Sequence, residues 1–254
     1  MFKQKVNIWK LVKGLSLAVL VAVSVAFSEY HQNEQVFGEI IVKFEKNTPT
    51  SFLTKEDVKQ LVREFIGTSL EGGKLIHIDS KQMEIHLKNN KFVKGVEVVK
   101  NLNGNIAIRI TQEQPIARFF SSDSSYYVTE ERHVVPLSSH HSERLMVVLG
   151  KGVDQLFIED SANTQVENKL MEVVNYIHQD PFWNAMIATA QLDSNNNLTL
   201  YPQVTKAKIE FGSCGNYVDK FEKLKLFYEK VLPTKGWKSY KRVNVEFEDQ
   251  LICE

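Results

Sequence analysis

The residue best suited to covalent chemistry in this 254-residue chain is Cys214, which lies in the sequence Gly-Ser-Cys-Gly at residues 212–215. A cysteine acts as a nucleophile when its surroundings favour the thiolate, and these residues match no complete nucleophile motif. The same residues suit the turn between a strand and a helix. We interpret them as such a turn and keep a secreted cysteine-dependent enzyme as an alternative.

Histidines and paired carboxylates are the remaining candidates for chemistry. His140 and His141 lie in a serine-rich loop without a third ligand at helical spacing, whereas a metal site needs three or four ligands. The glutamates at 130–131 and the pair Glu246 and Glu248 resemble solvated turn and strand faces. Phosphate-binding and dinucleotide fingerprints are missing from the sequence. The sequence therefore predicts no catalytic, cofactor-binding or metal-binding residues and favours an interaction protein.

Composition narrows the class of partner. Lysine plus arginine and aspartate plus glutamate both number 31, so no net charge attracts nucleic acid, and we expect no nucleic-acid partner. Hydrophobic residues make up 43% of the chain and charged residues 24%, which is ordinary globular usage. Cys214 and Cys253 are too few for a disulfide framework, and whether they pair with each other stays open.

The first thirty residues have a membrane-targeting pattern. Four lysines and no acidic residue occupy residues 1–13, and the uncharged stretch 14–28 follows directly. The positive-inside rule keeps the basic flank in the cytoplasm and puts everything after Glu29 outside it. We expect a cytoplasmic tail at 1–13 and a transmembrane anchor at 14–30. The alternative is a cleaved signal peptide, with a small-x-small cleavage site at residues 26–28.

The next segment predicts a compact α+β unit. Residues 39–44 form a short apolar strand, and a helix follows in which Thr54 and Asp57 make a capping box. A second cap at Asp79 begins a short helix, and an Asn-Gly turn at residues 103–104 joins two alternating strands. The predicted order is strand, helix, helix, strand, strand.

Beyond Pro115 the pattern changes to a second, strand-rich region. A long helix is predicted from a capping box of Asn216 and Asp219 to Pro233, and a last strand follows in which Val243, Val245 and Phe247 alternate with polar residues. Another helix carries an apolar face at residues 170–177. The remaining predicted strands cover residues 116–120, 126–129, 134–137, 145–149, 187–192, 198–201 and 207–211.

Six segments are diagnostic through their order and spacing. They are FLTKEDVKQL at 52–61, QPIAR at 114–118, YY at 126–127 with VPLS at 135–138, DPFW at 180–183, LPTKGW at 232–237 and YKRVNVEFEDQLIC at 240–253. Through them nearly the whole chain resembles the FtsQ/DivIB family of cell-division proteins, most closely its Bacteroidota members.

The resemblance implies an α+β fold with three parts. These are a single N-terminal transmembrane helix, a polypeptide-transport-associated (POTRA) domain of order β-α-α-β-β at 38–114, and a C-terminal mixed β domain with flanking helices at 115–254. It also implies a scaffold without enzymatic activity in the inner membrane at the division septum. Its domains would lie in the periplasm and bind FtsB and FtsL homologues, with FtsK, FtsW and FtsI types as further partners.

Family members bind the FtsB segment by strand addition next to the last strand of the β domain, which corresponds here to residues 243–253. The resemblance therefore implies a partner-binding site on this strand. Alternation gives Phe247 a core role as an open alternative to an interface role. The implied site residues are Tyr240, Arg242, Val245, Glu246, Phe247, Asp249 and Gln250.

The chain departs from the family pattern at three places. Glu113 stands where a basic residue is expected, and Arg132 with His133 occupies a turn where glycine is usual, which predicts a longer or bulged hairpin. Glu246 stands where other branches carry a basic residue. An alternative class, a POTRA-bearing secretion or outer-membrane assembly factor, would normally carry tandem POTRA copies or a membrane barrel.

Overall fold

The computed structural model describes residues 8–33, 37–45, 51–67, 75, 78–121, 124–150, 164–248 and 250–254. Its contacts divide the chain into two compact units. The first comprises residues 1–47 and 53–112, and the second comprises residues 48–52 and 113–254. Each unit has its own hydrophobic core.

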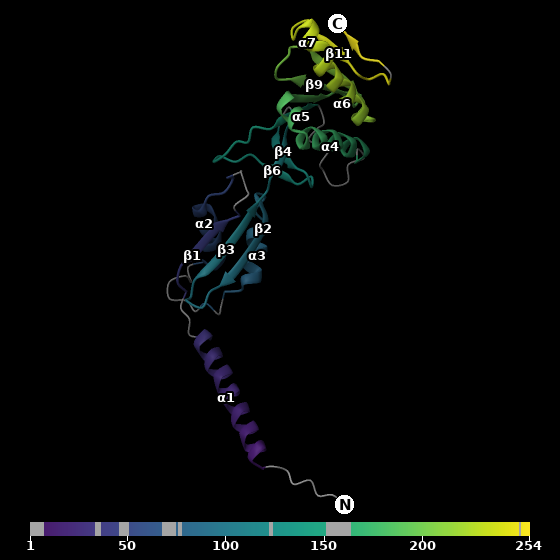
Figure 1. Ribbon diagram of the computed structural model, residues 1–254. Helices are drawn as coiled ribbons and strands as arrows, with labels where there is room; N and C mark the ends of the chain where they lie inside the picture. Colours follow the sequence, from purple (N-terminus) through teal and green to yellow (C-terminus); the bar gives the residue numbers. More distant parts are fainter. Residues whose placement is uncertain are drawn as a thin grey trace, which may run out of the picture. The chain divides into compact units, whose positions relative to one another are not determined.

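Helix α1 (Ile8–Asn33) contains the segment 14–30 for which the sequence predicts an anchor (Figure 1). The large apolar side chains described in its central part are exposed: Leu15, Leu17, Val19, Leu20, Val21 and Val23. Within the portion of the chain that the structure describes, no helix combines the length and the apolar character needed to cross a membrane.

The first unit contains a three-stranded sheet and two helices. Strands β1 (Ile40–Phe44), β2 (Val93–Lys100) and β3 (Ile106–Gln112) lie in the order β1-β3-β2. Strand β3 pairs parallel with β1 and antiparallel with β2, and Figure 1 labels all three strands. Helices α2 (Lys55–Ile66) and α3 (Ser80–Lys88) connect β1 to β2. The predicted order of strand, helix, helix, strand, strand is confirmed.

The predicted helix caps of this unit are confirmed. The Thr54 hydroxyl accepts a hydrogen bond from the Asp57 amide at 3.2 Å, and the Asp57 carboxylate accepts one from the Thr54 amide at 2.8 Å. At α3, the Asp79 carboxylate accepts the amides of Lys81 and Gln82. These bonds satisfy N–H groups that have no partner inside a helix. The apolar faces that follow meet in the core: Val58, Val62, Met83, Leu87, Ile106, Ile108 and Ile110.

The second unit is built on a nine-stranded sheet of order β12-β11-β10-β9-β8-β7-β4-β5-β6. Three of its pairings are parallel, namely β4 with β7, β7 with β8 and β10 with β11, and the rest are antiparallel. The strands are β4 (Pro115–Phe120), β5 (Ser125–Thr129), β6 (Val134–Pro136), β7 (Met146–Gly150), β8 (Ile187–Leu192), β9 (Leu198–Pro202), β10 (Lys208–Gly212), β11 (Arg242–Asn244) and β12 (Ile252–Cys253).

Helices α4 (Thr164–Gln179), α5 (Pro181–Met186) and α6 (Tyr217–Leu226) form the core with the buried face of this sheet. At its centre Trp183 of α5 packs against Phe221 of α6, with ring centroids 4.9 Å apart. On the outer face, the Tyr201 hydroxyl donates to Gln191 at 2.9 Å. Helix α5 was not expected from the sequence, although its N-cap, Asp180, accepts two amide hydrogen bonds and Pro181 begins the helix.

Two predictions about the last helix are wrong. Asn216 is in the left-handed conformation (φ 49°) and its side chain makes no cap hydrogen bond, so the predicted capping box is absent. The helix also continues beyond Pro233, through the π-helical turn η4 (Phe227–Val231) and α7 (Leu232–Lys235). A proline that follows a wider turn avoids the clash it would make inside an α-helix, and Pro233 lies in the first turn of α7.

We predict that Thr54→Ala lowers the free energy of unfolding of the first unit by about 1 kcal/mol, because the Asp57 amide loses its acceptor, the Thr54 hydroxyl. Urea denaturation followed by circular dichroism measures the loss. Gln60→Ala, on the exposed face of the same helix, is the matched control. It should change the free energy of unfolding by only a few tenths of a kcal/mol. Equal effects of the two substitutions would contradict the role assigned to the cap.

Candidate functional site

The predicted last strand is interrupted in the structure. Instead of one strand over residues 243–253, the chain forms β11 and β12, which pair antiparallel with Val243 opposite Cys253 and Asn244 opposite Ile252. On its other side β11 pairs parallel with β10. The prediction of a continuous terminal strand is therefore wrong, and β12 occupies the edge of the sheet.

A lysine of α6 explains why the strand stops. The Lys223 ammonium group donates to the carbonyl oxygens of Val245 at 3.2 Å and Glu248 at 3.1 Å, and also to that of Phe247. The Glu246 amide donates to the side chain of Asn244 at 2.9 Å. These backbone groups are therefore directed to side chains, so the ladder of β11 cannot continue through them.

The end of the neighbouring strand β10 is adapted to the same segment. Gly212 has φ +67°, and a Cβ atom there would lie 2.8 Å from the Cγ atom of Glu246. The buried ammonium group of Lys220 donates to the carbonyl oxygens of Phe211 at 2.9 Å and Ser213 at 2.7 Å. Burial lowers the pKa of Lys220. Two lysines on one face of α6 thus satisfy the carbonyl groups where two strands end.

Charged side chains join the three edge strands across the outer face of the sheet. Glu210 of β10 accepts hydrogen bonds from Lys208 at 3.0 Å, Arg242 at 3.1 Å and Asn244 at 3.2 Å. Arg242 also pairs with the Glu254 carboxylate. Partial burial raises the pKa of Glu210, but the bonds and charges of Lys208, Arg242 and Asn244 outweigh it and lower the pKa overall. The bond to Glu254 and the charge of Glu210 raise the pKa of Arg242.

The implied site residues divide into two groups. Tyr240 packs against Phe227 with ring centroids 5.7 Å apart, and Val245 is fully buried, with its amide donating to the Glu210 carbonyl at 3.0 Å. Both therefore belong to the fold of the edge. The surface group consists of Arg242, Glu246, Phe247 and Gln250, while Asp249 lies outside the described residues.

The core role considered for Phe247 is wrong. Its side chain is 46% exposed, since residue 247 has left the strand and alternation no longer points it inward. Sequence reasoning also missed Lys223, Glu210 and Glu254, which hold the edge together. Of these three residues, only Glu210 could have been found from the sequence pattern. Lys208 and Glu210 alternate with the buried residues of β10, so their side chains face outward together and can pair.

Cys214 does not have the properties of a nucleophile. Its side chain is buried, and burial raises its pKa to about 11 despite the nearby charge of Lys220. Cys253 is half-buried, burial also raises its pKa, and both cysteines are free thiols. The surroundings that lower the pKa of catalytic cysteines are therefore missing at Cys214.

Two of the departures from the family pattern contact each other. The buried Glu113 carboxylate lies 2.9 Å from Nδ1 of His133, and the His133 amide donates to the Thr129 hydroxyl. Arg132 adopts φ 69°, a left-handed conformation that glycine adopts readily. The unusual acid, Glu113, and the unusual turn at Arg132 and His133 therefore form one interaction.

The two loop histidines do not form a metal site. His141 lies 3.4 Å from Glu143. No cluster of metal-ligating side chains occurs among the described residues.

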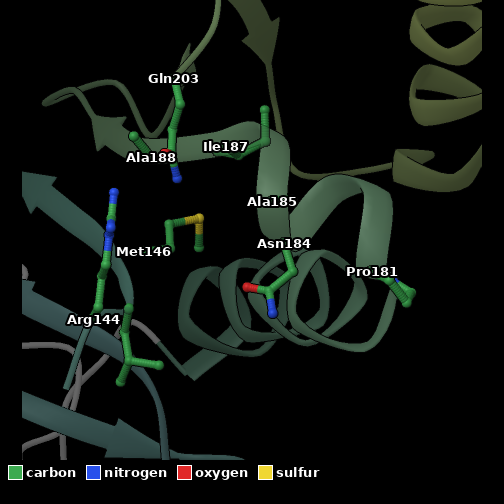
Figure 2. A pocket seen from close by; sticks show the side chains of 9 residues that line it. Arg144, Met146, Pro181, Asn184, Ala185, Ile187, Ala188 and Gln203 are labelled. Carbon is green, nitrogen blue, oxygen red and sulfur yellow. The ribbon is translucent and has the colours of Figure 1, made fainter.

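A second candidate is an open pocket of about 790 Å³ at the ends of β7 and β8 beside α5 (Figure 2). Met146 and Ile187 supply apolar surface, and the polar side chains of Arg144, Asn184 and Gln203 surround it. The lining contains one cation and neither a carboxylate nor a thiol, so it lacks the groups of a catalytic site.

Together these features define a protein with a small βααββ unit and a larger sheet that presents a charged, partly apolar edge. Comparison with known families agrees. The family described as "FtsQ/DivIB, C-terminal related" matches residues 114–254, which is more than half of the chain, and a POTRA-like domain matches residues 35–111. A search of curated proteins finds no match to the chain. The chain belongs to the FtsQ/DivIB family, a family of non-enzymatic cell-division scaffolds.

We predict that a small thiol reagent labels Cys253 well before Cys214 in the folded protein. At pH 8 a thiol with a pKa near 11 is thiolate in only about one part in a thousand, and Cys214 is also shielded. Mass spectrometry after timed alkylation with iodoacetamide measures both sites, and urea should make their rates similar. Rapid labelling of Cys214 without urea would restore the cysteine-dependent enzyme as a hypothesis.

We also predict that acid weakens the edge through Glu210. Because folding lowers the pKa of Glu210 from its ordinary value of 4.5, its stabilising effect is present above pH 4.5 and lost as the pH falls through the lower folded value. Thermal unfolding between pH 7 and 3 should show a smaller decrease for Glu210→Gln than for wild type. Glu97→Gln removes a carboxylate from the exposed pair with Arg109 and is the control. Parallel curves for all three would contradict the prediction.

Proposed function

We propose that the protein is a single-pass inner-membrane divisome scaffold that binds FtsB and FtsL homologues with its periplasmic units and links early and late division proteins at the septum. Residues 1–13 form the cytoplasmic tail, 14–30 the anchor, 38–114 the POTRA domain and 115–254 the β domain. FtsK, FtsW and FtsI types are further partners. Family membership supports the role in division.

The observation that carries the proposal is the incomplete edge at β11 and β12. Most strands of the second unit have five or six residues, whereas these two have three and two. The edge of a sheet is the place where a strand from another chain can be added by backbone hydrogen bonds. Around this edge, Arg242, Glu246, Phe247 and Gln250 are the exposed or half-exposed members of the proposed site, and Asp249 completes the set by its position in the sequence.

The basic flank and the uncharged stretch 14–28 support the anchor and its orientation, with the amino terminus in the cytoplasm. The alternative function, a secretion or outer-membrane assembly factor with a POTRA domain, predicts a different partner, namely an unfolded or barrel-forming client. Pull-down of FtsB and FtsL homologues against such a client separates the two functions.

We predict that Phe247→Ala weakens binding of the FtsB homologue about tenfold, because an exposed aromatic ring beside a docking edge can anchor a partner side chain. Isothermal titration calorimetry with the purified ectodomain measures the change. Leu226→Ala removes a side chain that is 58% exposed on α6 and is the matched control, expected to bind as wild type does. Both variants should keep the wild-type unfolding temperature.

A proline substitution in this segment is a less clear test of the binding site than Phe247→Ala. The Val245 amide donates toward β10, so Val245→Pro would damage the fold as well as the site. Phe247→Ala avoids that ambiguity. Equal affinities of Phe247→Ala and Leu226→Ala would remove Phe247 from the interface, and failure of wild type to bind either homologue would reject the proposed partners.

A further inference from the structure

The backbone groups on the outer side of β11 are already occupied by the chain itself. The Arg242 amide donates to the Glu254 carbonyl at 3.0 Å, and the Glu254 amide donates back to the Arg242 carbonyl at 2.9 Å. The Lys241 amide donates to the same Glu254 carbonyl at 2.6 Å. Residues 252–254 thus lie where a strand added to β11 would have to lie, and we call them the edge segment.

The two sides of β11 are held with very different strength. On the inner side, β11 pairs with β10, and the fully buried Val243 and Val245 anchor it in the core. On the outer side the edge segment contributes Ile252, which is 37% exposed, the half-buried Cys253, and Glu254, whose side chain is 60% exposed. Little apolar area keeps the edge segment in place, so it separates from β11 more easily than β11 separates from β10.

The outer side of the edge segment is a poor template for a partner. In an antiparallel pair the N–H and C=O groups of successive residues point alternately toward and away from the neighbouring strand, and those of Glu254 point to Arg242. In β12 only Cys253 then directs its backbone groups outward. Without the edge segment, β11 would offer the amides of Lys241 and Arg242, the Arg242 carbonyl and the Arg242 guanidinium group.

We propose that residues 252–254 are a self-complementing strand that covers the binding edge of β11, and that a partner strand displaces them and pairs with β11 directly. This inference rests on the proposed function for the identity of the partner. Because only molecules with an open edge bind, the apparent dissociation constant is the intrinsic one divided by the open fraction. The edge segment therefore sets the affinity of the scaffold and prevents edge-to-edge pairing in its free state.

The pairing geometry supplies a reversible lock for the test. Arg242 and Glu254 exchange both hydrogen bonds, so the next pair, Val243 and Cys253, is a non-hydrogen-bonded pair with its Cα atoms about 4.5 Å apart. That separation is within the range of a disulfide. Val243→Cys should therefore form a disulfide with the native Cys253 and hold the edge segment on β11.

We expect the oxidised Val243→Cys ectodomain to bind the FtsB homologue at least about tenfold more weakly than the reduced form. The apparent dissociation constant rises in proportion as the disulfide lowers the open fraction, so a tenfold lower open fraction is enough. Calorimetry after treatment with oxidised glutathione or dithiothreitol measures both states. The double substitution Val243→Cys with Cys253→Ser cannot form the lock and should bind equally in both buffers. Unfolding temperatures of all forms check the fold.

Equal binding of the locked and reduced forms would overturn the displacement, and tighter binding of the locked form would instead make β12 the docking strand. Hydrogen exchange in the free protein gives a readout without a partner. The amides of Arg242 and Glu254 should exchange faster than that of Val245, and equal rates would overturn the inference. If no form binds the homologue while exchange is uneven, the proposed partner fails and the self-complementing strand stands.

Discussion

The edge of the second unit depends on one constraint, which is that backbone carbonyl groups leaving a sheet must still find hydrogen-bond donors. Lys220 and Lys223 of α6 meet it. Lys220 caps the end of β10 from inside the core, and Lys223 collects three carbonyl groups after β11. Because the ammonium groups donate to these oxygens, the chain can leave the sheet after three residues of β11 and return as β12. The shape of the candidate site follows from that interruption.

Charged side chains on the outer face of the sheet connect the same edge strands. Glu210 links Lys208, Arg242 and Asn244, and Arg242 continues the network to Glu254, so one carboxylate ties β10 to β11 and another ties β11 to β12. Exposed ion pairs of this kind contribute little to stability individually. Their effect is to fix the register of short strands that bury few side chains. In the edge segment, which buries little apolar surface, the ion pair of Glu254 helps to hold the chain on β11.

This organisation is consistent with the FtsQ/DivIB family, whose members are non-enzymatic scaffolds. Among the described residues, Cys214 is buried with a raised pKa, and Glu113 and His133 pair with each other. What remains accessible is an edge, an exposed aromatic ring at Phe247 and charged groups with alternative partners. Such an edge must be protected while the protein is free, because an open strand pairs with any neighbour. A short strand of the same chain gives that protection and still allows exchange.

The sequence by itself determined most elements of both units, because capping residues such as Thr54 and Asp79 and apolar periodicity act over a few neighbours. It also indicated the family, which the family comparison confirms. Only the tertiary structure decided that the last strand is divided, that Asn216 does not cap its helix, and that Phe247 is exposed. The reason is physical. Lys223 lies more than twenty residues before the carbonyl groups it binds, and no local pattern around residues 245–248 records that contact.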